Sequence, residues 1–230
     1  MVAAQEMVGS MVTRKKGIGA GGDKSAPVTF EGAGVRAISG GSTSLAVAAP
    51  ALAAVGDLLI AVLMVRSAPS APAGWVLEAQ ETGTQASQRT VVYSKVATVG
   101  DLANTTFTQA ASNRFVGNMM AFAKGGAAPN VLATAKRVDT NAYVATLASV
   151  TGTKDGQMAV ASGSTVYADA SNSLTLSGEW TQTTPVTASD NRLGAGYRTV
   201  ENGDVTGGTI TAAGVGISTN SWPLVTVLLG

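Results

Sequence analysis

Short apolar runs rich in β-branched residues alternate with clusters of turn residues from Val28 onward. This pattern predicts many short strands joined by tight turns, and therefore an all-β chain. The abundance of Ala, Val, Thr, Ser and Gly, with few aromatic residues, also favours short strands over long amphipathic helices. The predicted strands are Val28–Phe30, Leu45–Ala48, Leu58–Val65, Trp75–Ala79, Thr90–Val96, Thr105–Thr108, Arg114–Phe122, Tyr143–Ala148, Gln157–Ser162, Leu174–Leu176, Trp180–Thr183, Arg192–Thr199, Thr209–Ala212 and Pro223–Leu229.

The stretch Leu45–Val65 is apolar enough to resemble a membrane span. Pro50, Gly56 and Asp57 lie near its middle, and a central aspartate is costly in hydrocarbon. We therefore interpret the region as two strands with a turn between them. The second strand, Leu58–Val65, is apolar throughout, as expected for a strand buried on both faces.

The two halves of the chain repeat the same order of landmarks about one hundred residues apart. A repeat of this kind fits either two small sandwiches or one sandwich with pseudo-twofold halves. We favour a single sandwich over residues 28–230, with halves of about 28–128 and 129–230, because no convincing linker separates them. The matched landmarks are Gly56, Trp75, Tyr93 and Asp101 in the first half and Gly156, Trp180, Tyr197 and Asp204 in the second.

A series of short motifs follows along the chain: Gly56-Asp57-Leu-Leu-Ile-Ala-Val, Pro72-Ala-Gly-Trp75, Val92-Tyr93-Ser-Lys-Val-Ala97, Gly100-Asp101, Thr105-Thr-Phe-Thr108 and Ser221-Trp222-Pro-Leu-Val-Thr-Val-Leu-Leu229. In this order they resemble a jelly-roll-like β-sandwich module of tailed-phage virion structural proteins. The resemblance covers roughly residues 43–229 and leaves the N-terminus outside it. It implies use in capsid decoration, head fibres or tail fibres, and it transfers no catalytic residue.

Composition argues against most enzyme classes. The 230 residues include no cysteine and no histidine, so the commonest nucleophile–base pairs and transition-metal ligands are missing. The formal net charge is +1, which steers the chain towards neither nucleic acid nor membrane. We expect a non-enzymatic protein without a cofactor or metal.

Residues 1–27 differ from the rest and are interpreted as an extended N-terminal arm. Their Gly17–Gly22 stretch matches a dinucleotide fingerprint, but no strand precedes it and no helix signal follows it. The basic cluster and the nearby methionines instead suggest docking on another subunit. The predicted partner-binding residues of the arm are Met7, Met11, Arg14, Lys15 and Lys16.

Two residue types in the sandwich admit a functional and a structural interpretation. Trp75, Trp180 and Trp222 could stack on glycans, but their matched positions favour a place in the core. Four aspartates stand next to glycines, at Asp57, Asp101, Asp155 and Asp204. They could form a carboxylate pair or a calcium site, but turn chemistry is the more frequent role.

These observations lead to a functional hypothesis. We expect a virion structural protein of a tailed phage, a capsid decoration or head-fibre protein anchored by its arm to other capsid or tail subunits. A homo-oligomer is expected, with a trimer as the guess by analogy, and neither nucleic acid nor membrane is an expected partner. The alternative is a tail-fibre or adhesin tip that binds a host receptor or glycan. A carboxylate hydrolase is the third hypothesis.

Overall fold

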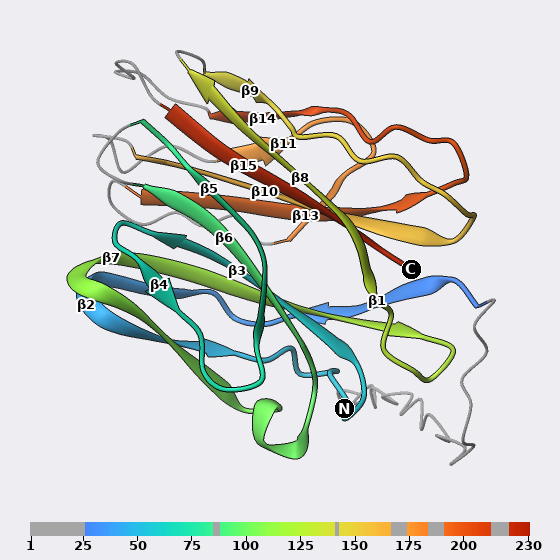
Figure 1. Ribbon diagram of the computed structural model, residues 1–230, viewed down its shortest axis with the longest axis horizontal. Helices are drawn as coiled ribbons and strands as arrows, with labels where there is room; N and C mark the ends of the chain where they lie inside the picture. Colours follow the sequence, from blue (N-terminus) through green and yellow to red (C-terminus); the bar gives the residue numbers. More distant parts are fainter. Residues whose placement is uncertain (1–25, 85–87, 141–142, 167–173, 184–190, 213–220) are drawn as a thin grey trace, which may run out of the picture.

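The computed structural model describes residues 26–84, 88–140, 143–166, 174–183, 191–212 and 221–230 (Figure 1). Within these ranges the only helical element is a single 3₁₀ turn, η1 (Val99–Asp101), and no helix is long and apolar enough to cross a membrane. All other regular elements are β-strands, and all pairs between them are antiparallel. The predicted all-β fold is confirmed.

The first half forms one large sheet with a small second layer. The large sheet has the order β1-β7-β3-β6-β5, and β2 and β4 also pair with β7. The strands are β1 (Val28–Ala33), β2 (Ala37–Ala48), β3 (Leu58–Val65), β4 (Pro69–Ser70), β5 (Val76–Thr82), β6 (Arg89–Val96) and β7 (Asn104–Lys124).

The second half repeats this arrangement with separate sheets. Its large sheet has the order β8-β15-β10-β13-β12, and its small sheet has the order β9-β14-β11. The strands are β8 (Val131–Thr140), β9 (Val144–Thr146), β10 (Gln157–Val166), β11 (Leu174–Leu176), β12 (Thr181–Gln182), β13 (Asn191–Val200), β14 (Thr209–Ala212) and β15 (Ser221–Leu229).

The two strand orders match position by position, so the predicted internal repeat is confirmed. The long strand β7 serves both layers of its half: its first residues pair with β2 and β4, and its last residues pair with β1 and β3. In the second half the same two roles are divided between β14 and β15. Each half thus contributes two layers of strands.

The two large sheets pack face to face, with the first half below and the second half above in Figure 1. We call this contact region the seam. Because β3 and β10 are central strands, one of their faces points into the seam and the other into their own half. Three hydrophobic cores result, one in each half and one in the seam. The seam core includes Leu58, Ile60, Val62, Met64, Phe122, Met158, Val160, Val225 and Val227.

One end of the seam is polar instead of apolar. The Thr90 hydroxyl donates to the carbonyl oxygen of Pro223 over 2.7 Å and shares a 2.7 Å hydrogen bond with the Ser164 hydroxyl. The Gln88 amide donates to the same Ser164 hydroxyl over 2.8 Å. These buried groups fix the register of one half against the other, because each would be costly to leave without a partner.

Two strand predictions were wrong in detail. Thr105–Thr108 and Arg114–Phe122 were predicted as separate strands, but both belong to the 21-residue strand β7. The strand β8 was not predicted, although it has ten residues. Most of its side chains are exposed on both faces, so its sequence carries no alternation of apolar and polar residues. The remaining predicted strands overlap observed ones.

Candidate functional site

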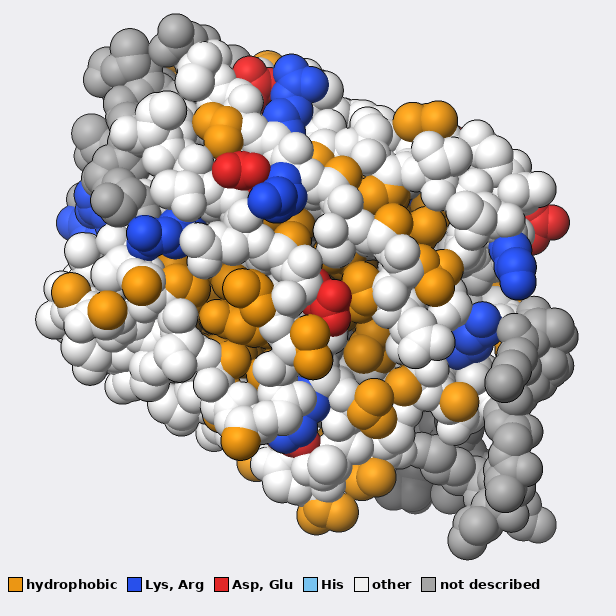
Figure 2. All heavy atoms as spheres, in the orientation of Figure 1, with side chains coloured by type: hydrophobic (Ala, Val, Ile, Leu, Met, Phe, Trp, Pro, Cys, Tyr) orange, Lys and Arg blue, Asp and Glu red, His pale blue; other side chains and the backbone are white. Residues whose placement is uncertain are grey.

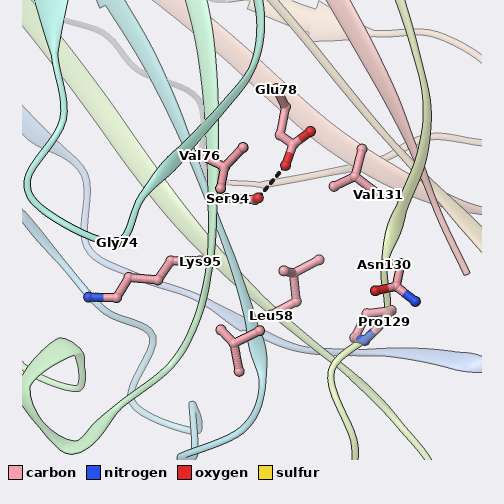
Figure 3. Close-up of a pocket in the computed structure, with 10 residues that line it drawn as sticks. Leu58, Gly74, Val76, Glu78, Ser94, Lys95, Pro129, Asn130 and Val131 are labelled. Carbon is pink, nitrogen blue, oxygen red and sulfur yellow. Dashed lines mark hydrogen bonds between the residues drawn. The ribbon is translucent and has the colours of Figure 1, made fainter.

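A cleft of about 480 Å³ opens on the seam, where the edge of the first half meets the start of β8 (Figure 3). Its walls combine apolar side chains with a few polar groups, as ligand sites commonly do. The lining residues are Leu58, Gly74, Val76, Glu78, Ser94, Lys95, Val96, Pro129, Asn130 and Val131.

The carboxylate in this cleft is placed by a β-bulge. Leu77 pairs with Tyr93 and Ala79 pairs with Val92, so Glu78 is the extra residue of β5. A bulge changes the direction in which a side chain points. The Ser94 hydroxyl donates a short hydrogen bond to Glu78 Oε1, and the two side chains point toward each other in Figure 3.

Lys95, the cation in the cleft wall, forms an ion pair with Asp101. Lys95 Nζ lies 2.7 Å from Asp101 Oδ1, and its side chain runs past Gly74, away from Glu78 (Figure 3). Burial by itself raises the pKa of Asp101. The hydrogen bonds from Lys95 and Thr98, together with the Lys95 charge, outweigh burial and hold that pKa below its ordinary value.

The opposite wall comes from the second half of the repeat. The backbone of Asn130 is fixed by two reciprocal hydrogen bonds with Gly230, of 2.9 Å and 3.0 Å. This pairing aligns Pro129 and Val131 across the cleft from β5, and it leaves the Asn130 side chain exposed. Leu58, which belongs to the seam core, is buried at the same place.

The polar groups of the cleft are one carboxylate, one hydroxyl, one amide and the Lys95 ammonium group. Among the residues that line the cleft there is one carboxylate, Glu78, whereas the usual glycosidase mechanism requires two. No group of three or more His, Cys, Asp or Glu residues that could hold a metal ion occurs within the described ranges. Glu78, Ser94 and Asn130 can bind a cationic or hydrogen-bonding group, and the valines can cover an apolar one.

The three tryptophans lie in the cores of the two halves. Trp75 is 9% exposed and packs edge-on against Phe107, with ring centroids 5.1 Å apart. Trp180 is 7% exposed and donates from Nε1 to the carbonyl oxygen of Gly207 over 2.7 Å. Trp222 is completely buried. None of the three therefore offers a ring face to a glycan in this structure.

Each of the four glycine-flanked aspartates accepts a backbone hydrogen bond, three of them within their own turn and Asp155 from a different connection. Asp57 accepts from the amide of Ala54 over 2.7 Å, and Asp155 accepts from the amide of Asn202 over 2.9 Å. In both halves the later aspartate accepts from the residue three positions before it and faces a cation six positions before it. These groups are Thr98 and Lys95 for Asp101, and Glu201 and Arg198 for Asp204.

The predicted arm residues Met7, Met11, Arg14, Lys15 and Lys16 lie outside the described residues, as does the Gly17–Gly22 stretch.

The cleft residues Glu78, Ser94 and Asn130 were not among the predicted site residues. The only sequence signal for them is the broken alternation at Val76-Leu77-Glu78, where two apolar residues precede an acid. Such a break is consistent with a bulge, but it does not specify what the bulge faces.

Comparisons of the chain with protein-family models, with curated proteins and with solved structures give no match.

Proposed function

We propose that the chain is a structural accessory protein of a tailed-phage particle, used for capsid decoration or as a head fibre. The sandwich would cover or project from a junction between subunits, and the N-terminal arm would anchor it there. Such a protein acts by burying apolar surface against its neighbours and by adding strands to them. The proposal begins from the resemblance in the order of motifs along the chain.

The observation that carries the proposal is the way in which the repeated motifs are used. Each half inserts a tryptophan, Trp75 or Trp180, into its own core immediately before a strand. Each half also closes a turn with an aspartate, Asp101 or Asp204. The aromatic and acidic side chains that could otherwise bind a ligand thus stabilise the fold. This is expected for a structural protein.

The surface also supports an assembly role. Hydrophobic side chains gather over the middle of the face seen in Figure 2. The exposed apolar residues include Val76, Leu77 and Val96 in the first half and Leu132 and Val138 on β8. Apolar groups concentrated at one face commonly mark a protein interface.

A second candidate function is receptor or glycan binding at the tip of a tail fibre or adhesin. The cleft with Glu78, Ser94 and Asn130 favours it, because carboxylate, hydroxyl and amide groups are suited to sugar hydroxyls. Among the described aromatic residues, however, only Tyr143 is strongly exposed, at 47%. A glycan site usually needs stacking surface, so this function ranks second.

The test is whether the protein is a stoichiometric part of particles. Particles from the source strain are purified by density gradient and analysed by quantitative mass spectrometry. The proposal predicts a fixed ratio of this chain to the major capsid subunit through repeated gradients. Its loss from the particle fraction under mild washing, or its complete absence, would remove the structural role. Glycan-array binding at Glu78, lost in Glu78→Gln, would support the second function.

A further inference from the structure

The outer edge of β8 is the most regular free strand edge of the described residues. Its ten residues pair with β15 from Val131 opposite Leu229 to Thr140 opposite Ser221, with one register shift at the start. β8 is the last strand of its sheet, so its other edge carries no ladder. An exposed edge of this length presents a row of backbone donors and acceptors to an incoming strand.

The other outer edges of the two large sheets are interrupted. The equivalent edge of the first half shifts register between Phe30 and Gly32 and then breaks between β1 and β2. The β5 edge contains the Glu78 bulge, and β12 has only two residues. Bulges and short strands are the usual protection against strand addition. β8 has one such irregularity, at Leu132, and charged side chains at Lys136 and Arg137. Its run Ala133–Thr140 is nevertheless the longest uninterrupted outer edge of the two large sheets within the described residues, and is therefore the best candidate for strand addition.

The β8 edge begins in the cleft. Val131 is both the first residue of β8 and part of the cleft wall, facing β5 and the Glu78 carboxylate. Leu132, 48% exposed, and Val76, 56% exposed, add apolar surface on the two sides. A segment that pairs with β8 would therefore extend into a cleft that accepts apolar side chains and one cation.

The N-terminal segment of this chain matches that chemistry. Residues 1–25 precede the described sandwich and contain Arg14-Lys15-Lys16, with methionine and valine pairs before them. Extended, 25 residues reach roughly 80 Å, enough to pass to a neighbouring molecule. The chain enters the sandwich where Val28 donates its amide to the carbonyl oxygen of Gly156 over 2.8 Å.

We propose that the N-terminal arm of one copy adds a strand to β8 of a second copy and sets a side chain of the Arg14–Lys16 cluster against Glu78. This inference rests on the proposed function, because a particle surface places copies of the chain side by side. The binding site proposed for the arm is thus the seam cleft of another copy of the same chain.

The experiment uses charge exchange in the full-length chain. Self-association is measured by sedimentation velocity for the wild type, for Glu78→Lys, for the triple variant R14E/K15E/K16E, and for all four substitutions together. Glu81→Lys is the matched control, because Glu81 lies on the same strand and does not line the cleft. Circular dichroism and thermal melting check that each variant is folded.

The wild type should associate, and Glu78→Lys and the triple variant should each weaken association by about 10-fold or more. The combined variant should recover most of the loss, and Glu81→Lys should behave as the wild type does. A monomeric wild type, an equal loss in Glu81→Lys, or no recovery in the combined variant would overturn the inference. If association is unaffected while the chain still co-purifies with particles at a fixed ratio, this inference fails and the proposed function stands.

Discussion

Lys95 and Asp101 form a 2.7 Å ion pair that ties β6 to the 3₁₀ turn before β7. Asp101 also accepts a 2.9 Å hydrogen bond from the backbone amide of Thr98. One carboxylate therefore holds both the end of β6 and the start of the 3₁₀ turn. The second half has the same spacing, but there Asp204 is 44% exposed at its side chain and lies 3.6 Å from Arg198. The equivalent ion pair is thus largely buried in the first half, whereas its aspartate is exposed in the second.

Asp101→Asn should therefore be the more damaging of two matched substitutions. We expect it to lower the free energy of unfolding by about 1–2 kcal/mol, because a charge-assisted bond to a largely buried partner is lost. Asp204→Asn should change it by less than about 1 kcal/mol, since exposed ion pairs contribute little. Urea denaturation of both variants measures the difference, and equal losses would contradict it.

The contribution of Asp101 should depend on pH. Because its pKa is lowered in the folded state, the carboxylate stabilises the fold fully above its ordinary value and loses this effect as pH falls through the folded pKa. The stability gap between wild type and Asp101→Asn should be constant above about pH 5 and shrink below about pH 4. A gap that persists unchanged to pH 2 would show that the charge is not responsible.

The pKa of Glu201 is shifted in the opposite direction to that of Asp101. Desolvation raises the pKa of Glu201, and the hydrogen bond with Asp155 and the negative charges of Asp155 and Asp204 raise it further. Carbon-detected NMR titration should give a midpoint above the ordinary value for a glutamate, and Asp155→Asn should bring it down. Because a raised carboxylate pKa disfavours the folded state as pH increases, Glu201→Gln should be at least as stable as the wild type at pH 7.

The two matched tryptophans should respond differently to replacement by phenylalanine. Trp180 Nε1 donates to Gly207, whereas Trp75 Nε1 is buried and makes no hydrogen bond within the described part of the chain. Trp180→Phe should therefore cost about 1 kcal/mol more than Trp75→Phe, because it leaves a carbonyl without its donor. Equilibrium unfolding in urea measures both. A larger loss for Trp75→Phe would mean that its indole is satisfied in solution.

Phe122 should couple the two halves through the seam. Its ring is completely buried and contacts Phe30 of the same half and Tyr197 of the other, with centroid distances of 5.6 Å and 6.5 Å. Phe122→Ala should lower stability by about 3–5 kcal/mol.

Hydrogen exchange after Phe122→Ala should lose protection in both β3 and β10, because both strands face the seam core. Val99→Ala, at a site 79% exposed, is the control and should leave both strands unchanged. Loss of protection confined to β3 would show that the two halves are energetically independent.

Local sequence signals predicted the fold best where burial and turn chemistry agree. Leu58–Val65, Leu174–Leu176 and Thr209–Ala212 were predicted with the observed bounds. Their side chains are buried in a regular pattern and their ends are marked by turn residues. The repeat, too, was visible in the sequence because its landmarks are turns and core anchors.

The cleft could not be predicted, because its two walls belong to different halves of the chain. The meeting of Glu78 with Asn130 and Val131 depends on how the large sheets pack, and no local pattern encodes that distance. The strand β8 was not predicted because it, too, lacks a local sequence signal. An edge strand that buries little on either face leaves no periodic signal. The unpaired edge of this strand is the one for which we propose strand addition.

The most direct test of the structural role is electron microscopy of intact particles with a gold-labelled antibody raised against residues 28–230. The account predicts regular labelling over the head, at many sites on each particle. Labelling confined to the tail tip would contradict the decoration or head-fibre role and favour receptor binding. Unlabelled particles, with the protein present elsewhere in the same lysate, would contradict the virion proposal altogether.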